Sequence, residues 1–414
     1  MTEPKPVRTA SVALVLLVIF LDTLGIGVII PVLPRLVASF VGGDLAAGSR
    51  WYGVLSATYS SMQFMFAPAI GALSDRFGRR TVILGSLAGA ATNYVLTIFA
   101  PSLAWLFVGR VIAGVSGASF SAATAYIADV TPPEKRAQNF GLVGAMFGLG
   151  FIVGPAVGGL LGRIDLRAPF ALAALLNAAN FAYGVFVLPE SLPKERRRAF
   201  SFKRANPVGA LLGLRRNPVL LGLSGTIVLS YLSQSILQSV WALHTQNRFG
   251  WSTLDVGLSL TAVGVAAATV QGGMVRPTVR RFGERRTMIF ALTCSGLGFV
   301  GFGVAWQAWA LYAIILPFAL GGLAGPATQA ILTRAVDPSE QGELQGTLAS
   351  LQSATYVLGP LISTRLFARF STAGSQPYVP GAAFFAAAIL TFTGLLLALR
   401  LFARQRSIDP TLTA

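Results

Sequence analysis

The feature that most constrains this chain is a succession of twelve apolar runs, each long enough to cross a lipid bilayer as a helix. A transmembrane helix needs about 20 mostly apolar residues. Only 11% of the residues are charged, against roughly 25% in a soluble chain, so these charges cannot cover a surface in water. We therefore expect an all-α integral membrane protein with twelve transmembrane helices, at 10–38, 51–73, 81–100, 103–126, 141–162, 168–188, 218–241, 255–275, 287–305, 309–332, 346–369 and 380–402.

Lysine and arginine are unevenly shared between the two sides of such a membrane protein. With both termini inside, the cytoplasmic connections and adjoining span ends hold 24 of the 32 basic residues, and the exterior ones hold 7. Basic residues concentrate on the cytoplasmic side of membrane proteins. We expect cytoplasmic N and C termini, and we attribute the net charge of +17 to orientation rather than to nucleic-acid binding.

The two halves of the chain share three short patterns at a spacing of 205 or 206 residues. RFGRRT matches RFGERRT, GPAVGG matches GPLIST, and TPPE matches DPSE, in segments that begin at 76 and 281, 154 and 359, and 131 and 337. Three matches near half the chain length indicate an internal duplication. Two parallel repeats around a midplane site are an architecture of secondary transporters.

The predicted domains follow from this duplication. We expect a six-helix bundle at 1–188 and a second at 218–414. The segment between them, 189–217, is polar and basic, so we expect it to be a cytoplasmic linker.

The connection between the second and third runs reads GALSDRFGRR. Glycine permits a tight turn, an aspartate can face a helix N-terminus, and Arg79 can reach a carboxylate, for which Asp129 in AYIADVT is the expected partner. Such a charge set would lock the two halves in an outward-facing state. The alternative is a capping aspartate among charges that only orient the chain. The predicted gating residues here are Gly71, Asp75, Arg76, Gly78, Arg79 and Arg80, with Asp129.

The fifth run carries GLGFIVGPAVGG. Small residues four positions apart permit close helix contact, and proline bends a helix. We predict that Gly154, Pro155, Gly158 and Gly159 take part in gating, with generic small-residue packing as the alternative.

These segments resemble known signatures. GALSDRFGRR resembles the loop signature of the major facilitator superfamily, and the GP-x(2)-GG arrangement resembles that of its drug:proton antiporters. DTLGIGVIIPVLPRL at 22–36, RAPFALAALLNAANF at 167–181 and LPES at 188–191 are similar to the tetracycline-resistance efflux branch, and the likeness weakens after residue 218. The resemblance implies the major facilitator fold and export of a drug-like molecule in exchange for protons.

Two charged residues lie deep in the apolar runs. Asp22 is the only deep acid and Arg110 the only deep base. A charge at the bilayer centre costs about 2.5–3.5 kcal/mol on insertion scales, so each must face a polar cavity or a partner. We predict that both take part in proton coupling. A structural hydrogen bond or a cap near the helix break at Pro31 is the alternative for Asp22, and helix organisation is the alternative for Arg110.

The chain departs from the tetracycline exporters at three places. They carry an acid in span 3, where this chain has Asn93, a histidine in span 8 and an acid in span 9. Here span 8 holds only Gln271, and span 9 has no ionisable group except Cys294. These differences favour neutral or lipophilic substrates over tetracycline.

Polar and aromatic side chains recur at helical spacing in several runs. A glutamine facing lipid would leave its amide unsatisfied, so these faces should point inward. Asn180 shares this expectation, and ligand binding and helix–helix hydrogen bonding are both open as reasons. The predicted substrate-binding residues are Tyr59, Gln63, Asn93, Asn177, Gln234, Gln238, Trp241, Gln352 and Tyr356.

Several function classes conflict with the residue content. One cysteine, one histidine (His244) and no GxxxxGK[ST] loop argue against a disulfide, a Cys or His metal site and a built-in ATPase. We therefore expect no cofactor and no enzyme, but a monomeric transporter in the cell inner membrane that uses a proton gradient to move a lipophilic small molecule. The alternatives are a transporter or uniporter of a metabolite such as a sugar, with Asp22 structural, and a non-transporting receptor or scaffold.

Overall fold

The structure is a computed structural model, and it describes residues 9–117, 119–193, 195, 197, 218–334, 336, 341–372 and 374–408. Within these residues the regular structure is helical throughout. Most of the predicted linker at 189–217 and the repeat segment DPSE lie outside the described residues.

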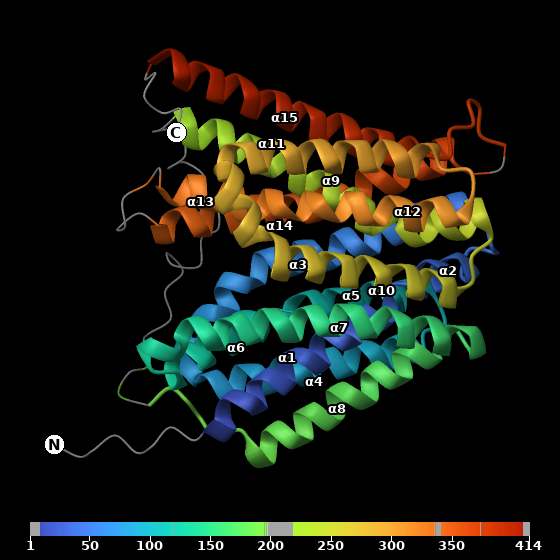
Figure 1. The fold of residues 1–414 in the computed structure, drawn as a ribbon. Coiled ribbons are helices and arrows are strands. Elements are labelled where there is room, and N and C mark those ends of the chain that lie inside the picture. The colour runs from blue at the N-terminus through green and yellow to red at the C-terminus, as the bar shows by residue number, and fades with distance from the viewer. Residues whose placement is uncertain are drawn as a thin grey trace. The chain divides into compact units, whose positions relative to one another are not determined.

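In the described part of its first half, the chain forms eight α-helices and a short 3-10 helix (Figure 1). The predicted break at Pro31 is present, because α1 ends two residues before this proline and the next helix leaves at 46°. The elements are α1 (Thr9–Ile29), α2 (Leu33–Ser39), α3 (Leu45–Phe77), α4 (Arg79–Ile98), α5 (Leu103–Ser116), α6 (Ser119–Val130), η1 (Pro133–Lys135), α7 (Arg136–Ile164) and α8 (Ala168–Val187).

Among the residues described from 218 onward there are seven α-helices, with a π-helical turn and a 3-10 turn at glycine pairs. Glycine pairs and π-turns are recognised causes of helix kinks. The elements are α9 (Pro218–Phe249), α10 (Thr253–Thr269), η5 (Val270–Met274), α11 (Val275–Val304), α12 (Ala308–Ala319), η6 (Leu320–Leu323), α13 (Ala324–Arg334), α14 (Gln341–Phe370) and α15 (Ala382–Ile408).

Six helical stretches of the described chain are long and apolar enough to cross a membrane, and the bent α1–α2 pair is a seventh. One of the six, Thr253–Val304, covers both the eighth and the ninth predicted spans. The remaining predicted spans lie in α3, α5–α6, α9 and α14. Helix α5 is apolar but only 14 residues long. Helices α3, α9 and α14 are more polar and carry the glutamines and tyrosines predicted to face inward.

The chain forms two compact units. The first comprises Met1–Gly42, Thr58–Asn206 and Ser252–Thr261, and the second comprises Gly43–Ala57, Pro207–Trp251 and Ala262–Ala414. Helices α3 and α10 therefore each contribute residues to both units.

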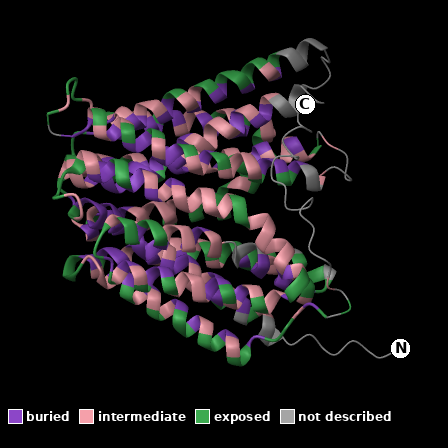
Figure 2. Ribbon diagram, turned by 180° about the vertical axis from the view of Figure 1, so that it is seen from behind, coloured by how far each residue is buried: buried purple, intermediate pink, exposed green. Residues whose placement is uncertain are grey.

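The first unit is organised around α1, which packs against α7 and α8, while α4 packs against α5 and α8. Its apolar core joins α1, α4, α6 and α7, and Tyr126 and Ile127 at its centre are fully buried. Buried and exposed residues alternate along each helix in Figure 2. Large apolar side chains are also exposed, such as Phe186 at 86% and Ile164 at 79%, as expected of surfaces that face lipid.

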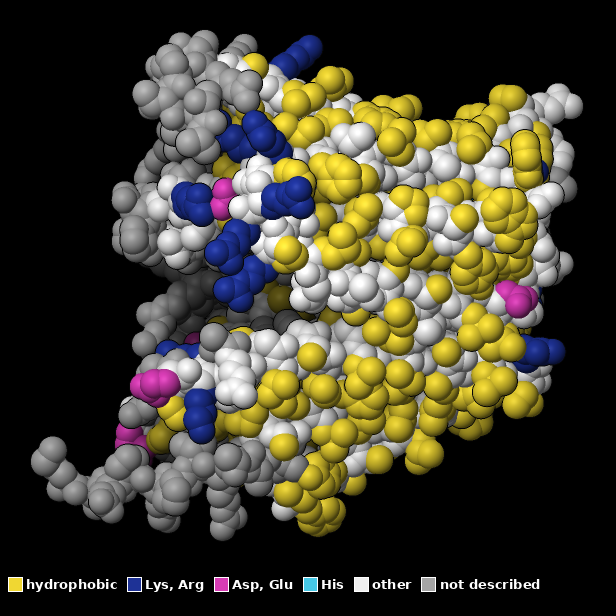
Figure 3. Space-filling model, viewed as in Figure 1, with side chains coloured by type: hydrophobic (Ala, Val, Ile, Leu, Met, Phe, Trp, Pro, Cys, Tyr) yellow, Lys and Arg dark blue, Asp and Glu magenta, His cyan; other side chains and the backbone are white. Residues whose placement is uncertain are grey.

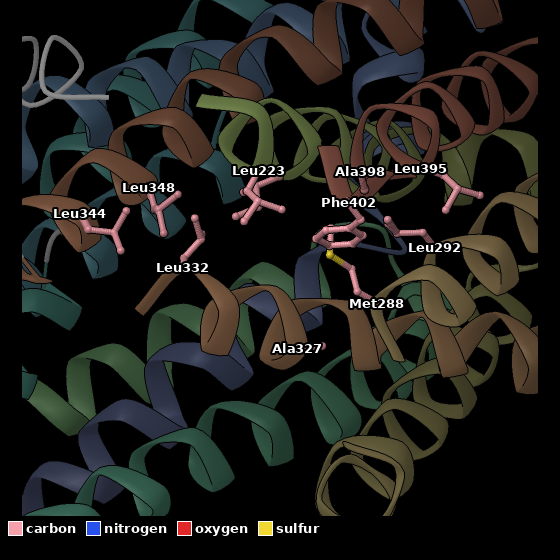
Figure 4. Packing of buried hydrophobic residues seen from close by; sticks show 11 residues of the cluster. Leu223, Met288, Leu292, Ala327, Leu332, Leu344, Leu348, Leu395, Ala398 and Phe402 are labelled. Carbon is pink, nitrogen blue, oxygen red and sulfur yellow. The ribbon is translucent and has the colours of Figure 1, made fainter. Parts of the chain in front are cut away.

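In the second unit α9 packs against α14 and α15, and α11 packs against α12, α13 and α15. Leu223, Met288 and Phe402 are among the buried residues of its core, which Figure 4 shows from close by. A separate aromatic group surrounds Phe302, which is 0% exposed and packs edge-on or at an incline against Trp241, Phe318 and Phe384.

Truncating Phe302 tests how much this aromatic group contributes to the stability of the second unit. We expect Phe302→Ala to lower the free energy of unfolding by about 3–5 kcal/mol, because it leaves a cavity among three rings. Melting followed by circular dichroism in detergent measures the change, with exposed Phe186→Ala as the control. Equal melting temperatures of the two variants would contradict a stabilising role for the rings around Phe302.

Candidate functional site

A polar cluster lies inside the first unit, where α1, α3, α4 and α5 meet. Asp22 and Arg110 are both close enough to the hydroxyls of Tyr59 and Tyr94 to interact with them electrostatically. Asp22 and Tyr59 are partly buried, and Tyr94 is buried. The two deep charges predicted from the sequence therefore belong to one site.

Asn93 is a hydrogen-bond partner of Arg110 in this cluster. The Arg110 Nη2 donates to Asn93 Oδ1 over 3.1 Å, and Asn93 is only 1% exposed. A Cβ on Gly109 would lie 2.9 Å from the same Oδ1, so glycine is needed for this approach of α5 to α4. The Asn93 amide is neutral, so this hydrogen bond does not itself neutralise the arginine charge.

Gln63 and Tyr59 lie where α3 touches α5. Gln63 Nε2 donates to the backbone carbonyl of Gly117 over 3.1 Å. A Cβ on Gly114 would come within 2.5 Å of the Tyr59 carbonyl, so the two helices are in close contact there. For the Gln63 amide nitrogen, hydrogen bonding between helices accounts for the inward orientation.

Two asparagines of α8 are buried beside α1. Asn177 and Asn180 are each 1% exposed, and their amide nitrogens donate to the carbonyls of Ala173 and Val18. Both Oδ1 atoms lack a hydrogen-bond partner within the described structure. A Cβ on Gly25 would lie 3.2 Å from Asn177 Nδ2 and 3.6 Å from the Tyr94 hydroxyl, so Asn177 borders the Asp22 cluster.

Tyr94 is a residue of this cluster that the sequence analysis missed. It follows Asn93 directly and carries a hydroxyl inside an apolar run. A buried tyrosine hydroxyl usually has a polar partner, and this requirement was the available signal.

The predicted polar residues of the second unit lie on α9 and α14. Gln234, Gln352 and Tyr356 are partly buried, and Gln238 is exposed. Trp241 is 3% exposed, and its ring packs against Phe302 and Phe384, with centroids 5.1 and 6.4 Å away. Tyr356 is close enough to Tyr231 of α9 for electrostatic interaction, which adds Tyr231 to this face.

The predicted gating loop is held together by Arg79. Its guanidinium lies 2.6 Å from Asp75 Oδ1 and 3.2 Å from Asp129 Oδ2 and donates to Ser74 Oγ. The expected contact between Arg79 and Asp129 is present. Gly78 has φ 104°, a conformation that favours glycine, and its turn brings α4 directly after α3.

The LPES segment after α8 clamps this loop, which the sequence analysis did not foresee. The Arg79 backbone N–H donates to Glu190 Oε1 over 2.9 Å, and Ser191 Oγ donates to Asp129 Oδ2 over 3.2 Å. Arg80 donates to the Val185 carbonyl near the end of α8. For Arg76 and Gly71, the other predicted gating residues of this loop, the contacts are of another kind. Arg76 lies over the Phe77 ring, and a Cβ on Gly71 would meet open space.

The second unit repeats this ion pair with its charges exchanged. Glu284 Oε1 lies 2.7 Å from Arg334 Nη2, and these residues stand 205 positions after Arg79 and Asp129. Gly283, 205 positions after Gly78, also has a positive φ, of 75°. The duplication has therefore kept the turn and the pair while reversing which helix carries the cation.

The glycines of α7 bring three helices into backbone contact within the first unit. A Cβ on Gly158 would overlap the Val28 carbonyl of α1, and one on Gly159 would overlap the Thr253 carbonyl at the start of α10. Gly154 and Pro155 face Gly27 and Gly257 in the same way. Thr253 Oγ1 donates to the Gly159 carbonyl over 2.9 Å, so the GPAVGG segment is a junction and not a lipid-facing surface.

The described residues contain no group of three His, Cys, Asp or Glu side chains arranged to hold a metal ion. Two helical repeats and a charged cluster buried among helices define a membrane transporter. Comparisons with known proteins agree with this class. Residues 15–276 and 223–413 match the Major Facilitator Superfamily.

Similar proteins narrow the family. Over 366 residues the chain is 42% identical to the class C tetracycline resistance protein of Escherichia coli, covering 88% of this chain and 92% of the relative. The class G tetracycline resistance protein of Vibrio anguillarum is 40% identical over 369 residues, with the same coverage. The crystal structure of the human organic anion transporter MFSD10 (TETRAN) has a TM-score of 0.69 and 27% identity, covering 95% of this chain and 100% of that chain.

The chain belongs to the Major Facilitator Superfamily, in the family of the tetracycline resistance proteins. This membership confirms the resemblance drawn from the sequence and the expected fold of twelve helices in two six-helix repeats. It also identifies the protein as a transporter and not an enzyme.

Exchanging the charges of the first ion pair tests its role. We expect Arg79→Asp and Asp129→Arg each to lower transport, because each leaves a charge beside one of its own sign. The double variant should recover part of the activity, since the pair Glu284 and Arg334 has this reversed polarity. Recovery is partial because Asp75 still faces position 79.

Proton flux evoked by a transported drug in everted vesicles measures the effect of this exchange. The charge-conserving Arg79→Lys and Asp129→Glu variants are the controls for side-chain shape. A double variant that is no more active than either single one would show that the pairing itself is unimportant.

Proposed function

We propose that this protein exports a drug-like small molecule from the cell in exchange for protons, by alternating access. The observation that carries the proposal is the cluster of Asp22, Arg110, Tyr59 and Tyr94 inside the first unit. A partly buried carboxylate among groups that respond to its charge can couple its protonation to helix positions. Similarity to tetracycline resistance proteins supports export of a drug.

In the proposed cycle Asp22 takes up a proton from the exterior. Its neutralisation removes the attraction that the carboxylate exerts on Arg110 and changes the field at the Tyr59 and Tyr94 hydroxyls. This favours the inward-facing state, from which the proton leaves as the drug binds. Coupling arises because proton and drug differ in their affinity for the two states.

The charged loop and the glycine junction are the proposed gates. Arg79 with Asp75 and Asp129 would hold the loop between α3 and α4 in one state, and the GPAVGG segment would hold α1 and the start of α10 in place. Both sets join parts of the chain by short polar or backbone contacts, which can be exchanged without deforming the helices.

For the substrate, the cluster favours a molecule without a strong positive charge. Asp22 is the one carboxylate predicted to lie deep in the membrane, and Asn93, which accepts a hydrogen bond from Arg110, is a neutral amide. Tyr59, Gln63 and Asn177 in the first unit and Gln234, Gln238, Gln352 and Tyr356 in the second are the proposed contacts. We propose that the protein works as a monomer in the inner membrane, with both termini cytoplasmic and no bound cofactor.

The first test uses everted membrane vesicles and records proton flux evoked by tetracycline, cationic dyes and neutral lipophilic antibiotics. We expect at least one drug to evoke flux and Asp22→Asn to abolish it without loss of folded protein. Exposed Asp44→Asn is the control. Full coupled transport by Asp22→Asn, or equilibration of a labelled compound without proton flux, would overturn the proton-coupling role and favour a uniporter.

A second test concerns substrate choice. Asn93→Asp places a carboxylate 3.1 Å from the Arg110 guanidinium and lowers the charge of the cluster by one. We expect this variant to favour tetracycline and cationic dyes over neutral drugs in the same flux measurement. Asn93→Gln, which keeps the amide, is the control. If the aspartate variant has the same drug preference as the wild type, residue 93 does not determine substrate choice.

A further inference from the structure

A basic cavity of about 340 Å³ lies at the start of α11, outside the site described above. Arg276, Pro277, Arg280 and Arg281 line it. All four are exposed, and Arg276 and Arg280 stand one helical turn apart on the same face. Figure 3 shows Lys and Arg side chains gathered at one end of the viewed surface, directly beside apolar side chains.

The three arginines have no acidic partner within the described structure. The neighbouring acid, Glu284, is paired with Arg334 at 2.7 Å, and the Arg281 guanidinium lies over the Phe282 ring, 5.5 Å from its centroid. Three cations around one concavity repel one another. An anion in the cavity would relieve this repulsion, and arginine is well suited to phosphate because its donors match the phosphate oxygens in pairs.

The internal repeat shows that this charge is particular to the second half. Positions 205 residues earlier hold Gly71, Asp75 and Arg76 in place of Arg276, Arg280 and Arg281. In the first unit Asp75 forms an ion pair with Arg79. Of the three arginines, only Arg281 has an arginine at the matching position of the first half. The fold and the RFG turn therefore do not require Arg276 and Arg280, which points to a different role for these two.

Apolar side chains flank the cavity along the chain. Met274 in the π-helical turn is 39% exposed, and Phe282 after Arg281 is 51% exposed. Met274 lies at the end of the eighth predicted span, and Phe282 lies between the eighth and the ninth. A ligand with an anionic phosphate and an apolar tail satisfies both surfaces at once, and basic pockets at cytoplasmic helix ends bind lipid headgroups in other membrane proteins.

We propose that Arg276, Arg280 and Arg281 bind the phosphate of an anionic phospholipid. The phosphate lies in the arginine-lined cavity, and the acyl chains lie along the apolar surface beside Met274 and Phe282. The inference does not depend on the proposed function, because it rests on charge and shape at a different place.

The experiment titrates purified full-length protein in detergent with phosphatidylglycerol and counts bound lipid by native mass spectrometry. We expect the R276Q/R280Q/R281Q variant to bind this lipid roughly a hundred-fold more weakly, from the loss of three cationic contacts. R136Q/R286Q/R400Q is the matched control, because it removes the same charge from exposed positions outside the cavity.

Two further arms identify the source of the phosphate. Phosphatidylcholine should bind wild type and both variants equally, since its headgroup has no net charge. Inorganic phosphate that displaces phosphatidylglycerol only at a large excess supports the lipid. Tight binding of inorganic phosphate alone, lost in R276Q/R280Q/R281Q, would overturn the lipid as the ligand.

Equal loss of phosphatidylglycerol in the two triple variants would show a general effect of surface charge and would overturn the site. Melting temperatures in lipid-free detergent check that the variants are folded. Should R276Q/R280Q/R281Q fail to fold, the single R276Q and R280Q variants replace it, and undiminished binding in both would overturn the proposal.

Discussion

A bilayer has no water to solvate polar groups, and this constraint organises the first unit. Each buried polar atom must find a partner inside the protein or carry a function. Asp22, Tyr59, Tyr94, Asn93 and Arg110 meet this requirement together, because four helices bring them to one place.

Close backbone approach is the second requirement, and glycine provides it. Gly109 lets α5 come near Asn93, and Gly158 lets α7 come near the Val28 carbonyl. A larger side chain at either place would separate the helices and the polar groups between them. The glycines of the fifth span therefore help to position α1, the helix that carries Asp22, although they carry no charge themselves.

The internal duplication shows which features the fold needs and which it can vary. Gly78 and Gly283 keep positive φ values after 205 residues, so the turn is a backbone requirement. The ion pair beside the turn keeps its position and exchanges its charges, so attraction matters there more than polarity. The arginines at 276 and 280 have no counterpart in the first half, which separates them from the needs of the turn.

The sequence by itself determined the apolar runs, the duplication, the gating loop and the two deep charges. These follow from composition, periodicity and short patterns, which are local properties of the chain. Only the tertiary structure decided that Asn93 is the partner of Arg110, that Tyr94 joins the cluster and that Glu190 clamps the loop. It also decided that the Trp241 ring packs among phenylalanines, although its spacing placed it beside two glutamines. Helical periodicity states which residues share a face but not what that face meets, because the opposing helix comes from a distant part of the chain.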